Sequence, residues 1–186
     1  MDRTRGFSTA AASFFRVLRP YKVRPASDET PWRWETGTQN HEAMAGVTAA
    51  VDYLAAIGER LGETGPRRRR LQTAMLATSA YERRLSEKLI AGLLDIPSVE
   101  FFGIREPERF AQRTPTVSIR IHGLSPRDAA ARLAKRGFFV WDGNYYALNL
   151  SERLEVESSG GMIRIGCAHY NTLAELDRLL EAIETL

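Results

Sequence analysis

The chain has 186 residues, 44% of them hydrophobic, which is enough to bury one core, or one core and part of another. Its formal charge of +3 is a mild excess carried mostly by arginine, and it does not single out a nucleic-acid partner. The single cysteine excludes an internal disulfide framework and fits a reducing, cytoplasmic compartment, and no apolar run approaches the length of a membrane span.

Two helices are predicted in the first half of the chain. Residues 1–15 carry no recognisable motif and are left unassigned, as an irregular start. Apolar residues then recur at helical spacing from Glu42 to Leu61, with an acid in the first turn. Gly62–Pro66 ends this helix, and a longer apolar stripe over Leu71–Leu93 predicts a second one. Helices of that length often bridge two lobes.

A dense basic run, Arg67–Arg70, lies between the two stripes. The helix dipole disfavours cations at a helix start, so we interpret the run as a solvated linker. A nucleic-acid surface would interleave aromatic or polar readers among the arginines, and this run has none. We therefore expect no nucleic-acid partner.

Beyond Pro97 the pattern changes from helical spacing to alternation, which is typical of strands. The predicted strands are Val99–Phe102, Thr116–His122, Phe138–Trp141 and Met162–Gly166. Ser125 and Thr172 each begin a helix, because each offers a capping side chain with an acid in the turn that follows. The order predicts an α+β fold with helices on one face of a small, mostly antiparallel sheet.

The segment Trp34–His41 leads into the first helix and places Thr36 and Thr38 on either side of Gly37. Backbone N–H groups and short hydroxyls can close around an anion at such a turn, and the positive end of the helix dipole points to the same place. An ordinary helix with Asn40 as its N-cap begins in the same way. The junction suits a phosphate without requiring one.

A second segment, Gly160–Thr172, is a short strand that enters a capped helix. Together with Arg24–Ala26 and Trp34–Leu54, it resembles the C-terminal part of class V aminotransferases, and most closely the cysteine desulfurase-like branch. The resemblance covers roughly Phe15–Leu186. It implies a fold-type I enzyme, of α/β context, that uses pyridoxal 5'-phosphate (PLP).

The resemblance also implies a domain organisation and a dimer. Fold-type I enzymes have a large cofactor domain and a smaller C-terminal lobe, so the chain divides into an unmatched segment 1–15, a remnant of the large domain at 16–66 and a small domain at 67–186. Gly37 and Thr38 match the family pair that contacts the cofactor phosphate bound to the neighbouring subunit. This match implies a homodimer.

Arg164 is the candidate substrate-binding residue. It alternates with Ile163 and Ile165 in the last strand, on a face where a guanidinium can receive a carboxylate through two parallel hydrogen bonds. From spacing alone, an arginine on a small sheet is more often solvated or salt-bridged. The resemblance places Arg164 at the family position that binds the α-carboxylate of the amino-acid substrate.

Tyr146 falls where cysteine desulfurases carry their persulfide-forming cysteine. A phenol cannot perform that attack, and the only thiol, Cys167, is expected in a buried segment. Aminotransferase, lyase or epimerase chemistry would suit the site better, with Tyr145 and Tyr146 lining the pocket.

PLP is held covalently by a lysine, and in the family that lysine lies upstream of the matched region. The three lysines of the chain, Lys22, Lys88 and Lys135, lack the expected surroundings, so covalent attachment is not expected. No residue is assigned a catalytic role. The three histidines, His41, His122 and His169, form no metal-binding pattern, so no metal is expected.

The leading hypothesis is therefore the C-terminal domain of a PLP-dependent enzyme acting on an amino acid. It would be a truncated or split form, inactive alone, and would pair with itself or with a partner chain that carries the large domain. The alternative is a non-catalytic interaction module that keeps the small-domain fold and binds a partner through its sheet face or through Phe138–Trp141.

Overall fold

The computed structural model describes residues 12–186, so most of the unassigned segment 1–15 lies outside the described residues. The chain divides into two compact units, with the boundary between Tyr53 and Leu54. We describe each unit by itself. The family-based segments 16–66 and 67–186 remain a prediction.

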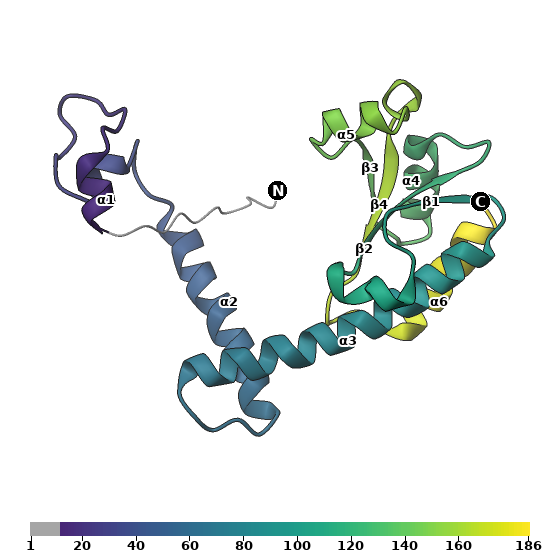
Figure 1. Cartoon of the computed structure of the whole chain (residues 1–186), viewed down its shortest axis with the longest axis horizontal. Coiled ribbons are helices and arrows are strands. Elements are labelled where there is room, and N and C mark those ends of the chain that lie inside the picture. The colour runs from purple at the N-terminus through teal and green to yellow at the C-terminus, as the bar shows by residue number, and fades with distance from the viewer. Residues whose placement is uncertain (1–11) are drawn as a thin grey trace. The chain divides into compact units, whose positions relative to one another are not determined.

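In the first unit, two short helices pack against each other. These are α1 (Ala12–Val17) and the 3-10 helix η1 (Trp32–Trp34). The Trp34 indole Nε1 donates to the carbonyl of Phe15 at 3.3 Å, and the two rings meet edge to face with centroids 5.5 Å apart. These contacts hold α1 beside η1, and the chain then runs through the Gly37 loop into the next helix (Figure 1).

The predicted first helix is confirmed as α2 (His41–Arg60), one residue earlier than expected at each end. Asn40 caps it, since its side-chain oxygen accepts from the Ala43 amide at 2.9 Å. Within the second unit, Gly58 lies so close to the next helix that an added Cβ would fall 1.9 Å from the Arg70 carbonyl oxygen. The last turn of α2 therefore packs backbone to backbone against the following helix.

The basic run is helical, and its interpretation as a linker was wrong. Helix α3 (Arg67–Asp95) begins directly after Pro66 and includes all four arginines in its first turn. Opposition from the helix dipole costs only about 0.3–1 kcal/mol at an exposed position. Most of the run is exposed to solvent, and Arg70 forms a salt bridge with Glu59 at 3.1 Å, which offsets that cost.

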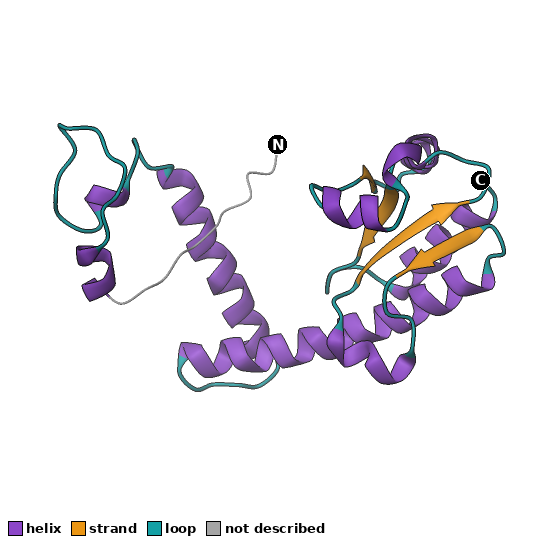
Figure 2. Ribbon diagram, turned by 45° about the horizontal axis from the view of Figure 1, so that its top comes forward, coloured by secondary structure: helices purple, strands orange, loops and turns teal. Residues whose placement is uncertain are grey.

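A four-stranded sheet organises the second unit, in the order β1-β2-β4-β3 with every pairing antiparallel. Its strands are β1 (Val99–Phe102), β2 (Thr116–Ile121), β3 (Trp141–Gly143) and β4 (Met162–Gly166). Figure 2 shows this sheet in orange. The predicted α+β fold and three of the four strands are confirmed.

The remaining predicted strand, Phe138–Trp141, is shifted along the chain, and the structure has β3 at Trp141–Gly143 instead. Gly137, with φ of 85°, ends the preceding helix, and the Phe138 amide bonds back to the Leu133 carbonyl at 3.0 Å. The next residues are extended but unpaired, and pairing with β4 begins only when Trp141 lies opposite Arg164. An alternating pattern reports which side chains face the core and does not report which residues find a partner strand.

Helices cover one face of the sheet, as predicted. They are α3, α4 (Pro126–Lys135) and α6 (Leu173–Glu184) (Figures 1 and 2). Ser125 caps α4 and Thr172 opens α6 with a capping box, both as expected. The side chains that fill the space between helices and sheet include Leu89, Leu93, Ile119, Leu133, Ile163 and Ile183, each at most 1% exposed.

Between β3 and β4 the chain forms α5 (Leu148–Arg153) and the 3-10 helix η3 (Glu157–Ser159). Another 3-10 helix, η2 (Pro107–Gln112), links β1 to β2. Among residues 12–186, no helix has the length and apolar character needed to cross a bilayer.

Candidate functional site

Arg164 lies at the centre of β4, on the face of the sheet that the helices leave open. Its neighbours Ile163 and Ile165 are 0% and 4% exposed and point into the core, so strand alternation directs Arg164 outward. Ser118 of β2 is its cross-strand partner on one side and Trp141 of β3 on the other.

Two aromatic rings hold the Arg164 guanidinium. Its Cζ atom lies 5.2 Å from the ring centroid of Trp141 and 5.3 Å from that of Tyr145, over the ring in each case. These are cation–π contacts, which stabilise the charged side chain without using its N–H donors. In the part of the chain that the structure describes, no carboxylate forms a salt bridge with Arg164.

A strained turn presents the tyrosines beside this arginine. Tyr145 and Tyr146 both have positive φ angles, 55° and 61°, a region that residues other than glycine rarely enter. Asn144 braces the turn, because its side-chain oxygen accepts from the Tyr146 amide at 3.1 Å and its Nδ2 donates to Glu157 Oε1 at 3.0 Å. Strain of this kind persists only where surrounding contacts impose it, and it is concentrated at functional sites.

Removing this brace should measurably weaken the fold. Asn144→Ala deletes both hydrogen bonds, and we expect it to lower the free energy of unfolding by about 1–3 kcal/mol. Urea denaturation of the full chain measures the change. Glu152→Ala, at an exposed position of neighbouring α5, is the matched control and should change stability by less than about 0.5 kcal/mol. Equal values for the two variants would contradict the bracing role.

The two tyrosines differ in environment. The Tyr145 ring is half-buried and its hydroxyl is fully buried, whereas Tyr146 is 97% exposed. Burial raises the pKa of Tyr145 far above its usual range, and Ser118 and Arg164 offset this only in part, so the phenol stays protonated at neutral pH. Both tyrosines line a cavity of about 330 Å³, with Trp141 and Glu157 among the other lining residues.

The predicted phosphate loop lies in the first unit. Thr36, Gly37 and Thr38 are exposed, and a Cβ added to Gly37 would meet no atom within 4 Å. The loop ends at Asn40, whose cap fixes the start of α2 and leaves other first-turn amides available. Its open backbone, two hydroxyls and helix N-terminus fit a phosphate group such as that of PLP.

The comparisons with known proteins establish the family. Residues 19–179 match the family described as aminotransferase class-V. The chain belongs to the class V aminotransferase family. An uncharacterized protein of Mycobacterium tuberculosis (strain CDC 1551 / Oshkosh) is 32% identical over 167 residues, which are 90% of this chain and 38% of that protein.

Cysteine desulfurases are among the relatives. A probable cysteine desulfurase 2 of Mycobacterium leprae (strain TN) is 31% identical over 153 residues, covering 82% of this chain and 31% of that protein. The apo structure of the cysteine desulfurase from Thermococcus onnurineus NA1 has the same fold, with a TM-score of 0.64 and 24% identity over 83% of this chain and 33% of that one. The predicted class V resemblance is thus confirmed, and the chain spans 31–38% of the length of the two sequence relatives.

Cys167 is the single cysteine of the chain. It follows β4 in a half-buried position. Burial raises the pKa of its thiol, and the carboxylates of Glu175 and Glu82 raise it further. Since the thiolate is the nucleophile, a raised pKa makes the thiol less reactive at neutral pH.

The reactivity of Cys167 can be measured directly. We expect iodoacetamide to alkylate the folded chain several times more slowly at pH 7.5 than the urea-unfolded chain, because the folded thiol holds its proton to a higher pH. The rate for the folded chain should keep rising with pH after that of the unfolded chain has levelled. Equal rates at pH 7.5 would show that folding does not suppress the reactivity of this thiol.

The structure places the three lysines of this class V chain in three separate settings. Lys22 Nζ contacts Asp28 at 3.0 Å and donates to the Ala26 carbonyl at 2.8 Å. Lys88 Nζ pairs with Asp177 at 2.5 Å, linking α3 to α6. Lys135 is exposed in the last turn of α4.

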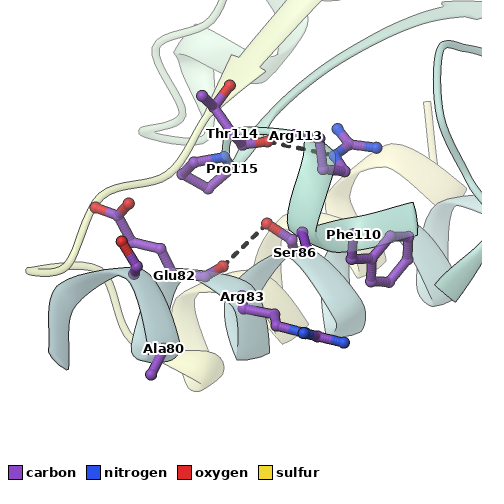
Figure 3. Close-up of a pocket in the computed structure, with 10 residues that line it drawn as sticks. Ala80, Glu82, Arg83, Ser86, Phe110, Arg113, Thr114 and Pro115 are labelled. Carbon is purple, nitrogen blue, oxygen red and sulfur yellow. Dashed lines mark hydrogen bonds between the residues drawn. The ribbon is translucent and has the colours of Figure 1, made fainter. Parts of the chain in front are cut away.

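A larger cavity in the second unit lies apart from Arg164. It has a volume of about 460 Å³ and lies between α3 and the segment that leads from η2 into β2 (Figure 3). Two of its polar side chains are bonded within the protein: the Ser86 hydroxyl donates to the Glu82 carbonyl at 2.9 Å, and Arg113 Nε donates to the Thr114 carbonyl at 3.3 Å. Sequence patterns gave no sign of this cavity, because it depends on the path of an irregular connection.

Proposed function

We propose that the chain is the C-terminal domain of a PLP-dependent class V enzyme that acts on an amino acid, with Arg164 as the receptor for the substrate's α-carboxylate. The observation that carries this proposal is Arg164 itself. A cation on the open face of β4, stacked on two rings and without a carboxylate partner among the described residues, keeps its N–H donors for a ligand.

The Gly37–Thr38 loop would bind the cofactor phosphate, by the family correspondence and because its open backbone and exposed hydroxyl fit an anion. When bound, PLP supplies the electron sink for chemistry at the substrate's α-carbon. This chain's contribution would be to orient the substrate: Arg164 fixes the carboxylate, the Tyr145 ring lies against its guanidinium, and Tyr145 and Tyr146 line a neighbouring cavity.

The reaction branch follows from the residue at the desulfurase position. Tyr146 is fully exposed and cannot form a persulfide, and Cys167 is half-buried with a raised pKa. We therefore assign an aminotransferase, lyase or epimerase reaction in preference to desulfuration. The single cysteine also supports a reducing, cytoplasmic setting.

The cofactor-binding lysine would be supplied by the large domain of the assembled enzyme. The phosphate loop, which in the family acts across a subunit boundary, supports a homodimer of the assembled enzyme. Met44, on the apolar stripe of α2, is 44% exposed and is part of the surface that such a partner would cover.

A chimera tests the proposal. The chain would replace the C-terminal third of the Thermococcus onnurineus cysteine desulfurase, whose fold it shares, and amino acids would be added to the PLP-loaded protein. We expect an amino-acid-dependent change in the cofactor's absorbance. A folded chimera that binds PLP but does not respond to any of the twenty amino acids would contradict the proposal. Carboxylate titration of the unmodified chain gives an independent measurement that does not need the chimera.

The chain alone should not attach the cofactor covalently. Incubation with PLP followed by borohydride reduction should leave the three lysines unmodified at stoichiometric PLP, because Lys22 and Lys88 are paired and Lys135 has no binding site around it. Intact-mass spectrometry measures the adduct and peptide mapping locates it. A stoichiometric adduct on Lys22 would show that the chain carries its own attachment site.

An interaction module is the second candidate, and one observation favours it. Phe139, in the segment that precedes edge strand β3, is 88% exposed, and such an edge can receive a partner's backbone. This candidate predicts that Phe139→Ser abolishes partner binding while carboxylate binding at Arg164 is unchanged. The enzyme-domain proposal predicts that Arg164 is needed for function and Phe139 is not.

A further inference from the structure

We propose that Trp141 and Tyr145 are positioning residues, which stack on the Arg164 guanidinium and fix its plane so that its in-plane N–H groups face the substrate carboxylate. This inference rests on the carboxylate role proposed for Arg164, and it adds the residues that make that side chain rigid. Neither ring is assigned a contact with the reacting atoms.

The geometry follows from two separate parts of the fold. Trp141 is the register partner of Arg164 on the neighbouring strand, so its ring lies beside the guanidinium by strand pairing. Tyr145 comes from the turn after β3 and brings a second ring to 5.3 Å from the same carbon, compared with 5.2 Å for Trp141. An arginine restricted by two rings loses less side-chain entropy when it binds a ligand.

Stacking uses the faces of a guanidinium and leaves its edge free. The five N–H donors of arginine lie in the guanidinium plane, and a carboxylate approaches along that plane to accept two parallel hydrogen bonds. Aromatic rings are therefore compatible with carboxylate binding in a way that a salt bridge to Asp or Glu would not be. The two rings leave the charge and the N–H donors of the Arg164 guanidinium available to a ligand while they restrict rotation of the side chain.

The turn that carries the Tyr145 ring is held by hydrogen bonds to neighbouring elements. Tyr145 has a φ of 55°, and Asn144 next to it is bonded to Glu157 at 3.0 Å. Glu157 in turn accepts a hydrogen bond from Ser151, which is 0% exposed. This chain of contacts ties the turn to the start of η3 and to α5. The strain at Tyr145 is thus imposed by its surroundings, and its result is a ring over Arg164.

The experiment uses the full chain and observes Arg164 directly. Isotope-labelled arginine gives an Nε–Hε resonance for Arg164, assigned by its loss in Arg164→Lys, and acetate or L-alanine is titrated as the carboxylate probe. The variants are Trp141→Leu and Tyr145→Leu, which keep apolar bulk, and Trp141→Phe and Tyr145→Phe, which keep a ring. Amide spectra confirm that each variant is folded.

We expect the leucine variants to move the Arg164 resonance toward the position of a free arginine and to speed rotation about its Nε–Cζ bond. They should also weaken carboxylate binding by about two- to fivefold, the range expected for one cation–π contact. The phenylalanine variants should stay close to the unaltered chain, and Tyr145→Phe would show that the ring acts without its hydroxyl.

The outcomes separate this inference from the proposed function. The Arg164 side chain could be immobile in the unaltered chain and mobile in the leucine variants, and yet not bind the carboxylate probe. In that case the positioning inference holds and the carboxylate role fails. If leucine and phenylalanine variants leave the Arg164 resonance and its rotation unchanged, positioning is overturned whatever the probe does. Should either leucine variant unfold, the Phe variants and the rotation rate in the unaltered chain still decide, since a freely rotating Arg164 excludes positioning.

Discussion

Replacing Arg164 with alanine should weaken amino-acid binding about ten- to hundredfold, because a charged hydrogen-bonded pair of this kind contributes roughly 1.5–3 kcal/mol. Cofactor binding should change far less, since the predicted phosphate contacts at Gly37 and Thr38 belong to the other unit of the chain. Titration of the chimera with PLP and then with the amino acid measures the two affinities separately.

Two further variants identify the physical cause of this loss. Arg164→Lys keeps the charge but not the planar fork, so its amino-acid affinity should fall between that of alanine and that of the unaltered protein. Arg127→Ala removes the same charge from an exposed position in the first turn of α4 and should have no effect. Unchanged affinity in Arg164→Ala, or equal losses in Arg164→Ala and Arg127→Ala, would reject the carboxylate assignment.

The sequence predicted the elements whose cause is local. Ile163 and Ile165 point inward and Arg164 outward because a strand alternates, and Thr172 opens α6 because a capping box needs only residues close in sequence. Asn40 capped α2 for the same reason. These features follow from short-range geometry, so the pattern and the structure agree.

The features that were missed depend on contacts between distant residues. The side chains of Phe138–Val140 alternate as in a strand, but backbone pairing of this segment with β4 begins only at Trp141. The interpretation of Arg67–Arg70 rested on its charge alone. In the structure a helix can begin there because Arg70 forms a salt bridge with Glu59, 11 residues earlier in the chain. Local propensity could not show either contact.

The sequence named three residues of the candidate site but not Trp141, and it did not predict how these residues are arranged. Arg164, Tyr145 and Tyr146 were proposed from a resemblance, but nothing in the spacing indicated that the rings of Tyr145 and Trp141 would both lie against the Arg164 guanidinium. Strand register decides the second contact, and a turn with two positive φ angles decides the first. Register and positive φ at a tyrosine are both imposed by tertiary structure.

Gly161→Ala should be the most disruptive single-methyl change near the site. Gly161 precedes β4, is buried and has a φ of 74°. An added Cβ would lie 2.3 Å from the carbonyl oxygen of Gly143 and 2.4 Å from its carbonyl carbon. These are backbone atoms, so the clash cannot be relieved by a side-chain rotation. The start of β4 and the end of β3 would have to separate.

The expected loss of unfolding free energy is about 2–5 kcal/mol, from roughly 1–2 for a left-handed backbone at a residue with a Cβ and roughly 1–3 for overpacking. Gly166→Ala is the matched control at the other end of β4, because its Cβ would meet only the Thr116 hydroxyl at an ordinary 3.7 Å. Its stability should be unchanged or higher by up to about 1 kcal/mol. Urea denaturation followed by circular dichroism compares the two.

The same substitution links the fold to the site. Because β3 carries Trp141 and leads to Tyr145, separating β3 from β4 at Gly161 should draw both rings away from Arg164. We therefore expect Gly161→Ala to shift the Arg164 resonance in the direction of the leucine variants, and Gly166→Ala to leave it in place. A Gly161→Ala chain as stable as the unaltered one, with Arg164 unmoved, would show that the two strands are not held together at this glycine and that the rings are positioned by other contacts.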